Sequence, residues 1–194
     1  NRSASASLTT AVERVLNDPD NGSGERNRET LNLRTGEQLS ALDEAPKDRG
    51  GRLRALLSSK GDLFAEYDNF VAKRWALTTA GLMLSDFPTR QWDKATSADV
   101  NEALEEPSAL QRVEHSGATL YLLPDGLLPL TLAFKTQTGE RGLLQVTALH
   151  DNQRAITIRY KLVRNNPAKP KLAPKTGSVP GPVTELTPGL SDLD

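Results

Sequence analysis

Three carboxylates lie in a glycine-containing tract, DPDNGSGE, from Asp18 to Glu25. Hard cations such as Ca²⁺ bind carboxylate oxygens in glycine-containing loops of this kind. The tract departs from the twelve-residue calcium loop, because Ser23 stands where that loop requires glycine. We therefore predict a polar turn here and no metal site.

The other residues that could do chemistry form no catalytic pattern. His115 and His150 are the two histidines, and no HExxH helix is present to supply zinc ligands. No serine lies in a GxSxG turn, and the pair Glu105-Glu106 stands at an expected helix end, where carboxylates are usually exposed. The chain has no cysteine, which excludes disulfides and thiolate chemistry. The sequence thus predicts no catalytic residue, no cofactor and no metal.

Six residues are candidates for an interaction surface: Trp75, Trp92, Tyr121, Arg154, Arg159 and Lys161. Only 5% of the residues are aromatic, so we expect both tryptophans to anchor a core. The alternative is a ligand groove around Trp75, Trp92 and Tyr121. The net charge is -1, and few aromatics interleave with the basic residues, so we expect the cations to face the acidic helix near residues 93–106 and not nucleic acid.

The clearest secondary-structure signal is the run Gly142 to Leu162, in which two alternating apolar stretches flank a polar break at His150 to Arg154. This pattern predicts a β-hairpin. The face expected to be buried carries Leu144, Val146, Ala148, Ile156, Ile158, Tyr160 and Leu162. The face expected to contact water carries Gln145, Thr147, Thr157, Arg159 and Lys161.

Three predictions concern the first half of the chain. Leu8 to Leu16 and Glu29 to Arg34 flank a dense turn cluster, which favours a hairpin with a long tip. Arg52 to Ser59 has helical spacing, with Gly61 as its stop. The uncharged run Ala76 to Leu84 is interpreted as one buried strand.

A helix is the best-signalled element of the second half. Thr96 or Ser97 can cap a helix over Ala98 to Glu105. Thr119 to Leu123 and Leu130 to Thr136 are predicted strands around the turn at residues 124–126. The length of 194 residues suits one domain. We place that domain at Leu8 to Arg164.

The ends of the chain differ in composition from this domain. The first seven residues are small and polar and are expected to be a tether, and residues 165–194 hold six of the twelve prolines, as in a disordered tail or linker. No apolar run approaches the roughly 18 residues that span a bilayer. The predicted fold class is α+β: a mainly antiparallel sheet, two short helices on one side and a C-terminal β-hairpin.

The segment GLLQVTALHDNQRAITIRYKLV, Gly142 to Val163, resembles a C-terminal signature of bacterial extracytoplasmic proteins in which a GILQI-like strand precedes DNPRG and VKIRYKLV. Two earlier pieces fit in order, at Val12 to Ser40 and at Gly81 to Leu104. That module is similar to the region after the membrane anchor in sigma-factor-regulating proteins and in membrane zinc peptidases of the antibiotic-sensor type. Gln153 and Ala155 replace the usual Pro and Gly at the hairpin tip.

The resemblance implies a non-catalytic sensing or protein-interaction module, located outside the cytoplasm of a bacterium, with a protein partner. The chain begins at Asn1 and not at Met, so we expect a removed signal or a membrane tether before it. Two alternatives stay open. One is a small hydrolase or carbohydrate-binding domain that uses the aromatic groove, and the other is a structural subunit whose Pro-rich tail docks into an assembly.

Overall fold

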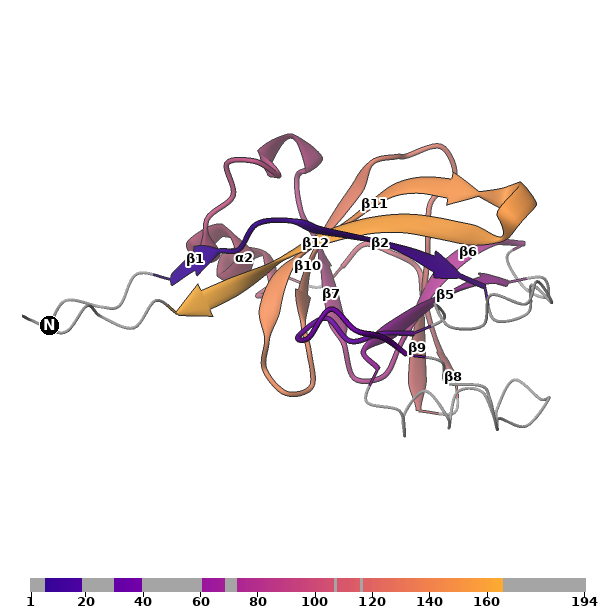
Figure 1. The fold of residues 1–194 in the computed structure, drawn as a ribbon, viewed down its shortest axis with the longest axis horizontal. Coiled ribbons are helices and arrows are strands. Elements are labelled where there is room, and N and C mark those ends of the chain that lie inside the picture. The colour runs from indigo at the N-terminus through magenta and orange to yellow at the C-terminus, as the bar shows by residue number, and fades with distance from the viewer. Residues whose placement is uncertain are drawn as a thin grey trace, which may run out of the picture.

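Two six-stranded antiparallel sheets contain about half of the residues that the structure describes (Figure 1). The structure is a computed structural model that describes residues 6–18, 30–39, 61–68, 73–106, 108–115 and 117–165. Of the interpretable residues, 52% are in strands and 11% are helical. The fold is therefore predominantly β, and the predicted α+β class is wrong. Within the described ranges there is one α-helix, α2 (Ser97–Ala103), and the other predicted helix, Arg52 to Ser59, lies outside them.

The first sheet is built around the longest strand, β12 (Ala155–Asn165). β12 pairs on one side with β11 (Arg141–His150), which pairs with β10 (Leu130–Lys135), which in turn pairs with β7 (Met83–Asp86). On its other side β12 pairs with two short strands, β2 (Val12–Asn17) along its first half and β1 (Ala6–Leu8) at its end. β12 is eleven residues long, so β2 and β1 can pair one after the other along the same edge of it.

The second sheet has the strand order β4-β3-β5-β6-β9-β8. Its strands are β4 (Gln38–Leu39), β3 (Thr30–Leu31), β5 (Leu63–Asp68), β6 (Arg74–Thr79), β9 (Ala118–Leu122) and β8 (Arg112–His115). The main hydrophobic core contains fully buried residues of both sheets, among them Leu63, Leu77, Leu132, Phe134 and Ile158. Burial of these alternating side chains is the main force that holds the sheets together.

The C-terminal hairpin is confirmed, with one change in register. Leu144 lies opposite Tyr160 and Val146 opposite Ile158, as the alternation predicts. A β-bulge then adds one residue to β11, so that Leu149, and not Ala148, lies opposite Ile156. The predicted core position of Ala148 is therefore wrong, because a bulge exchanges the faces of all residues beyond it.

The other face of the hairpin is largely covered, contrary to the prediction that it contacts water. A second hydrophobic cluster on this face contains Phe87, Trp92, Val100, Ala133 and Leu143. Helix α2 and the preceding 3-10 turn η2 (Thr89–Gln91) supply the cover. The cap of α2 is as predicted: Thr96 and Asp99 form a reciprocal capping box.

The predicted N-terminal hairpin is wrong, because its two strands belong to different sheets. β2 pairs with β12, and Leu16 lies opposite Ile156. β3 pairs with β4 and β5. Likewise, the run Ala76 to Leu84 is not one strand: a turn containing Gly81, at φ +69°, divides it between β6 and β7. The strands predicted around residues 124–126 are confirmed as β9 and β10, but these also lie in separate sheets.

The predicted domain boundaries, Leu8 and Arg164, both lie within strands. β1 includes Ala6 and Ser7, the last two residues of the expected tether. β12 extends to Asn165, and the remainder of the expected Pro-rich tail lies outside the described residues. In the part of the chain that the structure describes, no helix is long and apolar enough to cross a membrane.

Candidate functional site

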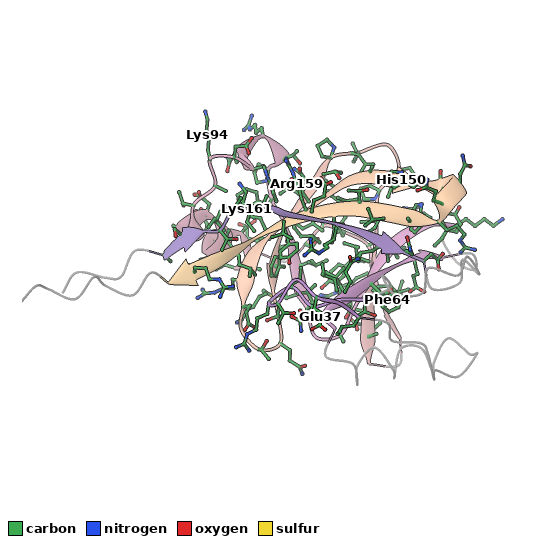
Figure 2. The ribbon with its side chains drawn as sticks, in the orientation of Figure 1. Glu37, Phe64, Lys94, His150, Arg159 and Lys161 are labelled. Atoms are coloured by element: carbon green, nitrogen blue, oxygen red, sulfur yellow. The ribbon has the colours of Figure 1, made fainter. Side chains whose placement is uncertain are left out.

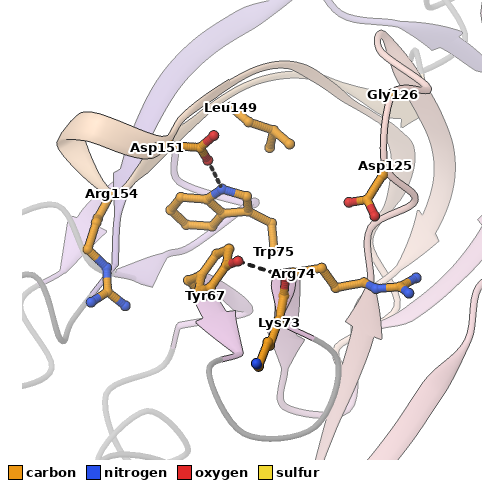
Figure 3. Close-up of a pocket in the computed structure, with 9 residues that line it drawn as sticks. All are labelled: Tyr67, Lys73, Arg74, Trp75, Asp125, Gly126, Leu149, Asp151 and Arg154. Carbon is orange, nitrogen blue, oxygen red and sulfur yellow. Dashed lines mark hydrogen bonds between the residues drawn. The ribbon is translucent and has the colours of Figure 1, made fainter.

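A pocket of about 620 Å³ opens at the tip of the C-terminal hairpin (Figure 3). Four separate segments form it: the end of β5, the start of β6, the loop after β9, and the hairpin tip with its 3-10 turn η3 (Asp151–Gln153). The lining residues are Tyr67, Lys73, Arg74, Trp75, Asp125, Gly126, Leu149, Asp151 and Arg154. A pocket of this size can hold a drug-sized molecule.

Two aromatic rings form one wall of the pocket. Tyr67 on β5 lies directly opposite Trp75 on β6 in the sheet register. Their rings meet edge to face, with 5.7 Å between centroids and an interplanar angle of 83°. The Tyr67 hydroxyl donates a hydrogen bond of 2.7 Å to the carbonyl of Lys73. These contacts fix the rings in place before any ligand is bound.

A hydrogen bond ties the hairpin tip to the second sheet. The indole Nε1–H of Trp75 donates to Oδ1 of Asp151 at 2.8 Å (Figure 3). Trp75 is only 3% exposed, so it belongs to the main core as well as to the pocket wall. A buried indole N–H requires an acceptor, and Asp151 supplies it.

Arg154 is held by an ion pair with a buried carboxylate. Its guanidinium bonds to Asp18, whose side chain is 1% exposed. The amide of Tyr67 also donates to the Asp18 carboxylate, at 3.2 Å, and the Asp18 amide donates to the carbonyl of Arg154 at 2.7 Å. Asp18 therefore joins the end of β2 to the pocket. It is also the one residue of the candidate calcium tract that the structure describes, and it bonds to a guanidinium instead.

Both described non-glycine residues with a positive φ lie in this pocket. Lys73 has φ 50° and Arg154 has φ 46°. This left-handed conformation is uncommon for residues with a side chain and costs of the order of 1–3 kcal/mol at each position. Asp18 and the Tyr67 hydroxyl offset part of that cost by bonding to Arg154 and to the Lys73 carbonyl.

Three charged side chains of the pocket have no ion-pair partner among the described residues. These are Lys73, Arg74 and Asp125. The Nε–H of Arg74 is buried and has no hydrogen-bond acceptor among the described residues. An unpaired buried donor is rare in a folded protein and needs an explanation.

The structure brings only two of the six candidate interaction residues, Trp75 and Arg154, to the pocket. Tyr121 is buried in the main core, where its hydroxyl donates to the carbonyl of Leu82 at 3.5 Å. Trp92 is buried in the second cluster. Because the three aromatics are buried in two separate clusters, the predicted groove around Trp75, Trp92 and Tyr121 does not form.

The two remaining candidates, Arg159 and Lys161, are both on β12 (Figure 2). Their charged groups lie against the ring of Trp92. The Arg159 guanidinium carbon is 4.6 Å and the Lys161 Nζ 4.7 Å from the ring centroid. Lys161 Nζ also donates to the carbonyl of Trp92 at 2.9 Å, and Arg159 Nε donates to the side chain of Gln145 at 2.8 Å. These cations are held by cation–π contacts and hydrogen bonds, and not by the predicted pairing with acidic residues of the helix.

The histidines and carboxylates are not arranged as a metal site in the described ranges. There, no group of three or more His, Asp or Glu side chains could hold an ion. His150 Nε2 lies 2.8 Å from the hydroxyl of Thr157, which agrees with a polar residue at the hairpin turn. The side chain of His115 is outside the described residues.

Comparison of this chain with protein-family models, with curated proteins and with solved structures found no match. The resemblance of Gly142 to Val163 to the extracytoplasmic module thus stays a prediction.

Most of the pocket residues could not be found from the sequence. Tyr67, Lys73, Arg74 and Leu149 belong to no motif, and their common position depends on strand pairings between distant segments. Asp125 and Gly126 were recognisable only as a turn. The usable signals were Trp75 and Arg154, which were candidate interaction residues, and Asp151, which lies in the predicted polar break at the hairpin tip.

Proposed function

We propose that this protein is a non-catalytic sensing or protein-interaction module, active outside the bacterial cytoplasm, that recognises its ligand in the pocket at the hairpin tip. The observation that carries the proposal is the placement of Lys73 and Arg154. Among the described residues they are the two with side chains in left-handed conformation, and both line the same pocket. Backbone strain tends to be retained where function requires it.

The construction of the pocket supports this proposal. Its aromatic wall and its hairpin tip are fixed by the Tyr67–Lys73, Trp75–Asp151 and Asp18–Arg154 contacts. A site fixed in advance spends less of its binding energy on ordering side chains. The extracytoplasmic part of the proposal is supported by the sequence resemblance at Gly142 to Val163.

A hydrolase or carbohydrate-binding role is the second candidate, on a revised site. Asp125 and Asp151 both line the pocket beside Tyr67 and Trp75. Paired carboxylates near aromatic rings are typical of glycoside-processing sites. One oxygen of Asp151 already accepts the Trp75 indole N–H, which favours a positioning role for this carboxylate over proton transfer. The docking-arm alternative depends on residues beyond 165, which lie outside the described residues.

A thermal-shift screen tests the leading proposal. The panel contains amino acids, short peptides, phosphorylated small molecules and oligosaccharides. A ligand at about one hundred times its Kd stabilises the folded state by about 2.7 kcal/mol. For a domain of this size that raises Tm by roughly 5–10 °C. We expect at least one class to do so, and Arg74→Gln to abolish the shift while Arg90→Gln, at an exposed position on η2, retains it.

Two results would contradict the proposal. The first is that no class stabilises the wild-type protein, or that every stabilising ligand acts equally on Arg74→Gln. The second is turnover of ester, peptide or glycoside substrates that is lost in Asp125→Asn, which would favour the hydrolase.

A further inference from the structure

The pocket is lined by five charged side chains, two acidic and three basic. In Figure 3 the carboxylates of Asp125 and Asp151 lie above the level of the three cationic side chains, Lys73, Arg74 and Arg154. Asp125 comes from the loop after β9 and Asp151 from the hairpin tip, whereas Lys73 and Arg74 come from the start of β6. Arg154 follows Asp151 on the hairpin tip, so charges of both signs occur on either side of the pocket.

Two of these five charges already have partners inside the protein. Asp151 accepts the Trp75 indole N–H, and Arg154 pairs with Asp18. Within the described ranges the other three, Lys73, Arg74 and Asp125, form no ion pair. The groups left for a ligand are thus two cations and one carboxylate.

Arg74 is the residue with most to gain from a ligand. Its Nε–H is buried without an acceptor in the part of the chain that the structure describes, so the guanidinium is only partly satisfied in the free protein. The buried Nε–H is shielded from a ligand, so a ligand carboxylate would bind the Nη groups of Arg74, with charge-assisted hydrogen bonds.

We propose that the pocket binds a ligand that carries both an ammonium and a carboxylate, namely a short peptide with free ends. This inference rests on the proposed function and specifies its ligand. The peptide carboxylate would bind Arg74, and its ammonium would bind Asp125. The chain between them would pack on the apolar surface of Tyr67, Trp75 and Leu149. The volume of about 620 Å³ exceeds what one small amino acid fills.

Ligands with one sign of charge fit this pocket less well. A simple anion bound to Arg74 would also lie near the carboxylate of Asp125, which forms no ion pair within the described ranges. A simple cation would meet Asp125 but would be repelled by the two free cations. Like charges brought together at a binding site weaken binding and so provide specificity.

Isothermal titration calorimetry with trialanine tests the proposal, because its only charges are its two ends. We expect trialanine to bind, and N-acetyl-trialanine and trialanine amide each to bind at least tenfold more weakly. Arg74→Gln should weaken trialanine at least tenfold but change the affinity of trialanine amide little, since the amide has already lost the carboxylate. Likewise, Asp125→Asn should weaken trialanine at least tenfold but change the affinity of N-acetyl-trialanine little, since the acetylated peptide has already lost the ammonium. Arg90→Gln, outside the pocket, should bind as the wild type does.

Each other outcome has a defined meaning. The proposal is overturned if the capped and free peptides bind equally, or if correctly folded Arg74→Gln and Asp125→Asn, as judged by circular dichroism, bind trialanine as wild type does. If trialanine fails while another class in the thermal-shift screen acts through Arg74, this inference fails and the proposed function stands. If no class binds, both fail.

Discussion

Two acidic residues of this protein, Asp18 and Asp62, are accommodated by the fold in different ways. Near the pocket, Asp18 receives a guanidinium and a backbone amide, so its charge is compensated. Asp62 instead receives the amide of Leu33 at 2.7 Å. Burial raises the pKa of Asp62, and the nearby charge of Glu140 raises it further, while the Leu33 hydrogen bond lowers it. Asp62 is thus a carboxylate whose protonated form the fold favours.

This difference predicts a pH dependence of stability. An acid whose pKa is raised by folding contributes stability below its unfolded pKa, near 3.8, and that contribution is lost as pH rises through the raised value. Relative to wild type, Asp62→Asn should therefore become more stable between pH 3 and pH 7. Urea denaturation at several pH values measures this difference, since asparagine can still accept the Leu33 hydrogen bond.

Glu140 provides a control of the opposite sign. Hydrogen bonds from Thr138 and Thr136 lower the pKa of Glu140, and Arg34 adds to the effect. Its contribution is present above the unfolded pKa, near 4.5, and is lost as pH falls. Glu140→Gln should accordingly lose stability relative to wild type as pH rises. Parallel pH profiles for the two variants would contradict the account of Asp62.

At the scale of elements, the C-terminal hairpin requires a residue without a side chain at Gly142, where β11 lies close to both β12 and β10. Gly142 lies opposite Leu162 on one side and opposite Phe134 on the other. A Cβ atom at Gly142 would lie 2.0 Å from the carbonyl oxygen of Lys161 and 2.8 Å from the Phe134 ring. Only glycine fits between these two neighbours.

Gly142→Ala should therefore lower the free energy of unfolding by about 1–3 kcal/mol, the usual cost of overpacking a core. Gly117→Ala is the comparison, because a Cβ at Gly117 meets nothing within 4 Å and the only cost there is its positive φ of 80°. Chemical denaturation of both variants gives the two values. A loss at Gly142 no larger than at Gly117 would show that the hairpin does not need this approach.

Sequence patterns predicted correctly those elements that are defined by interactions between residues close together in the chain. The alternation of Gly142 to Leu162 and the cap at Thr96 each identified an element because the pattern and its cause lie within a few residues. The bulge in β11 has no such signal. It moved Leu149 into the position expected for Ala148, since one inserted residue reverses a period of two.

At the scale of the whole molecule, the position of the pocket depends on pairing between strands that are distant in the sequence, which local sequence patterns do not predict. β2 and β12 are neighbours in the first sheet although Leu16 and Ile156 are 140 residues apart, as 156 − 16 shows. The same long-range pairings bring the ends of β5, β6, β9 and β11 to one place and so create the pocket. No spacing within one segment encodes that meeting point, and for this reason Trp75 was predicted as a core anchor but its polar neighbours were not.

NMR signals of the two indole N–H groups can test most directly whether the pocket at the hairpin tip is the ligand site. Trp75 donates its indole N–H to Asp151 in the pocket, while Trp92 is buried in the second cluster. The chain contains two tryptophans, so a ¹H–¹⁵N spectrum shows two indole signals, which Trp75→Phe assigns. Titration with trialanine should shift the Trp75 signal in a saturable manner and leave Trp92 unmoved. A saturable shift of Trp92 alone, or no shift of Trp75 at saturating peptide, would contradict the account.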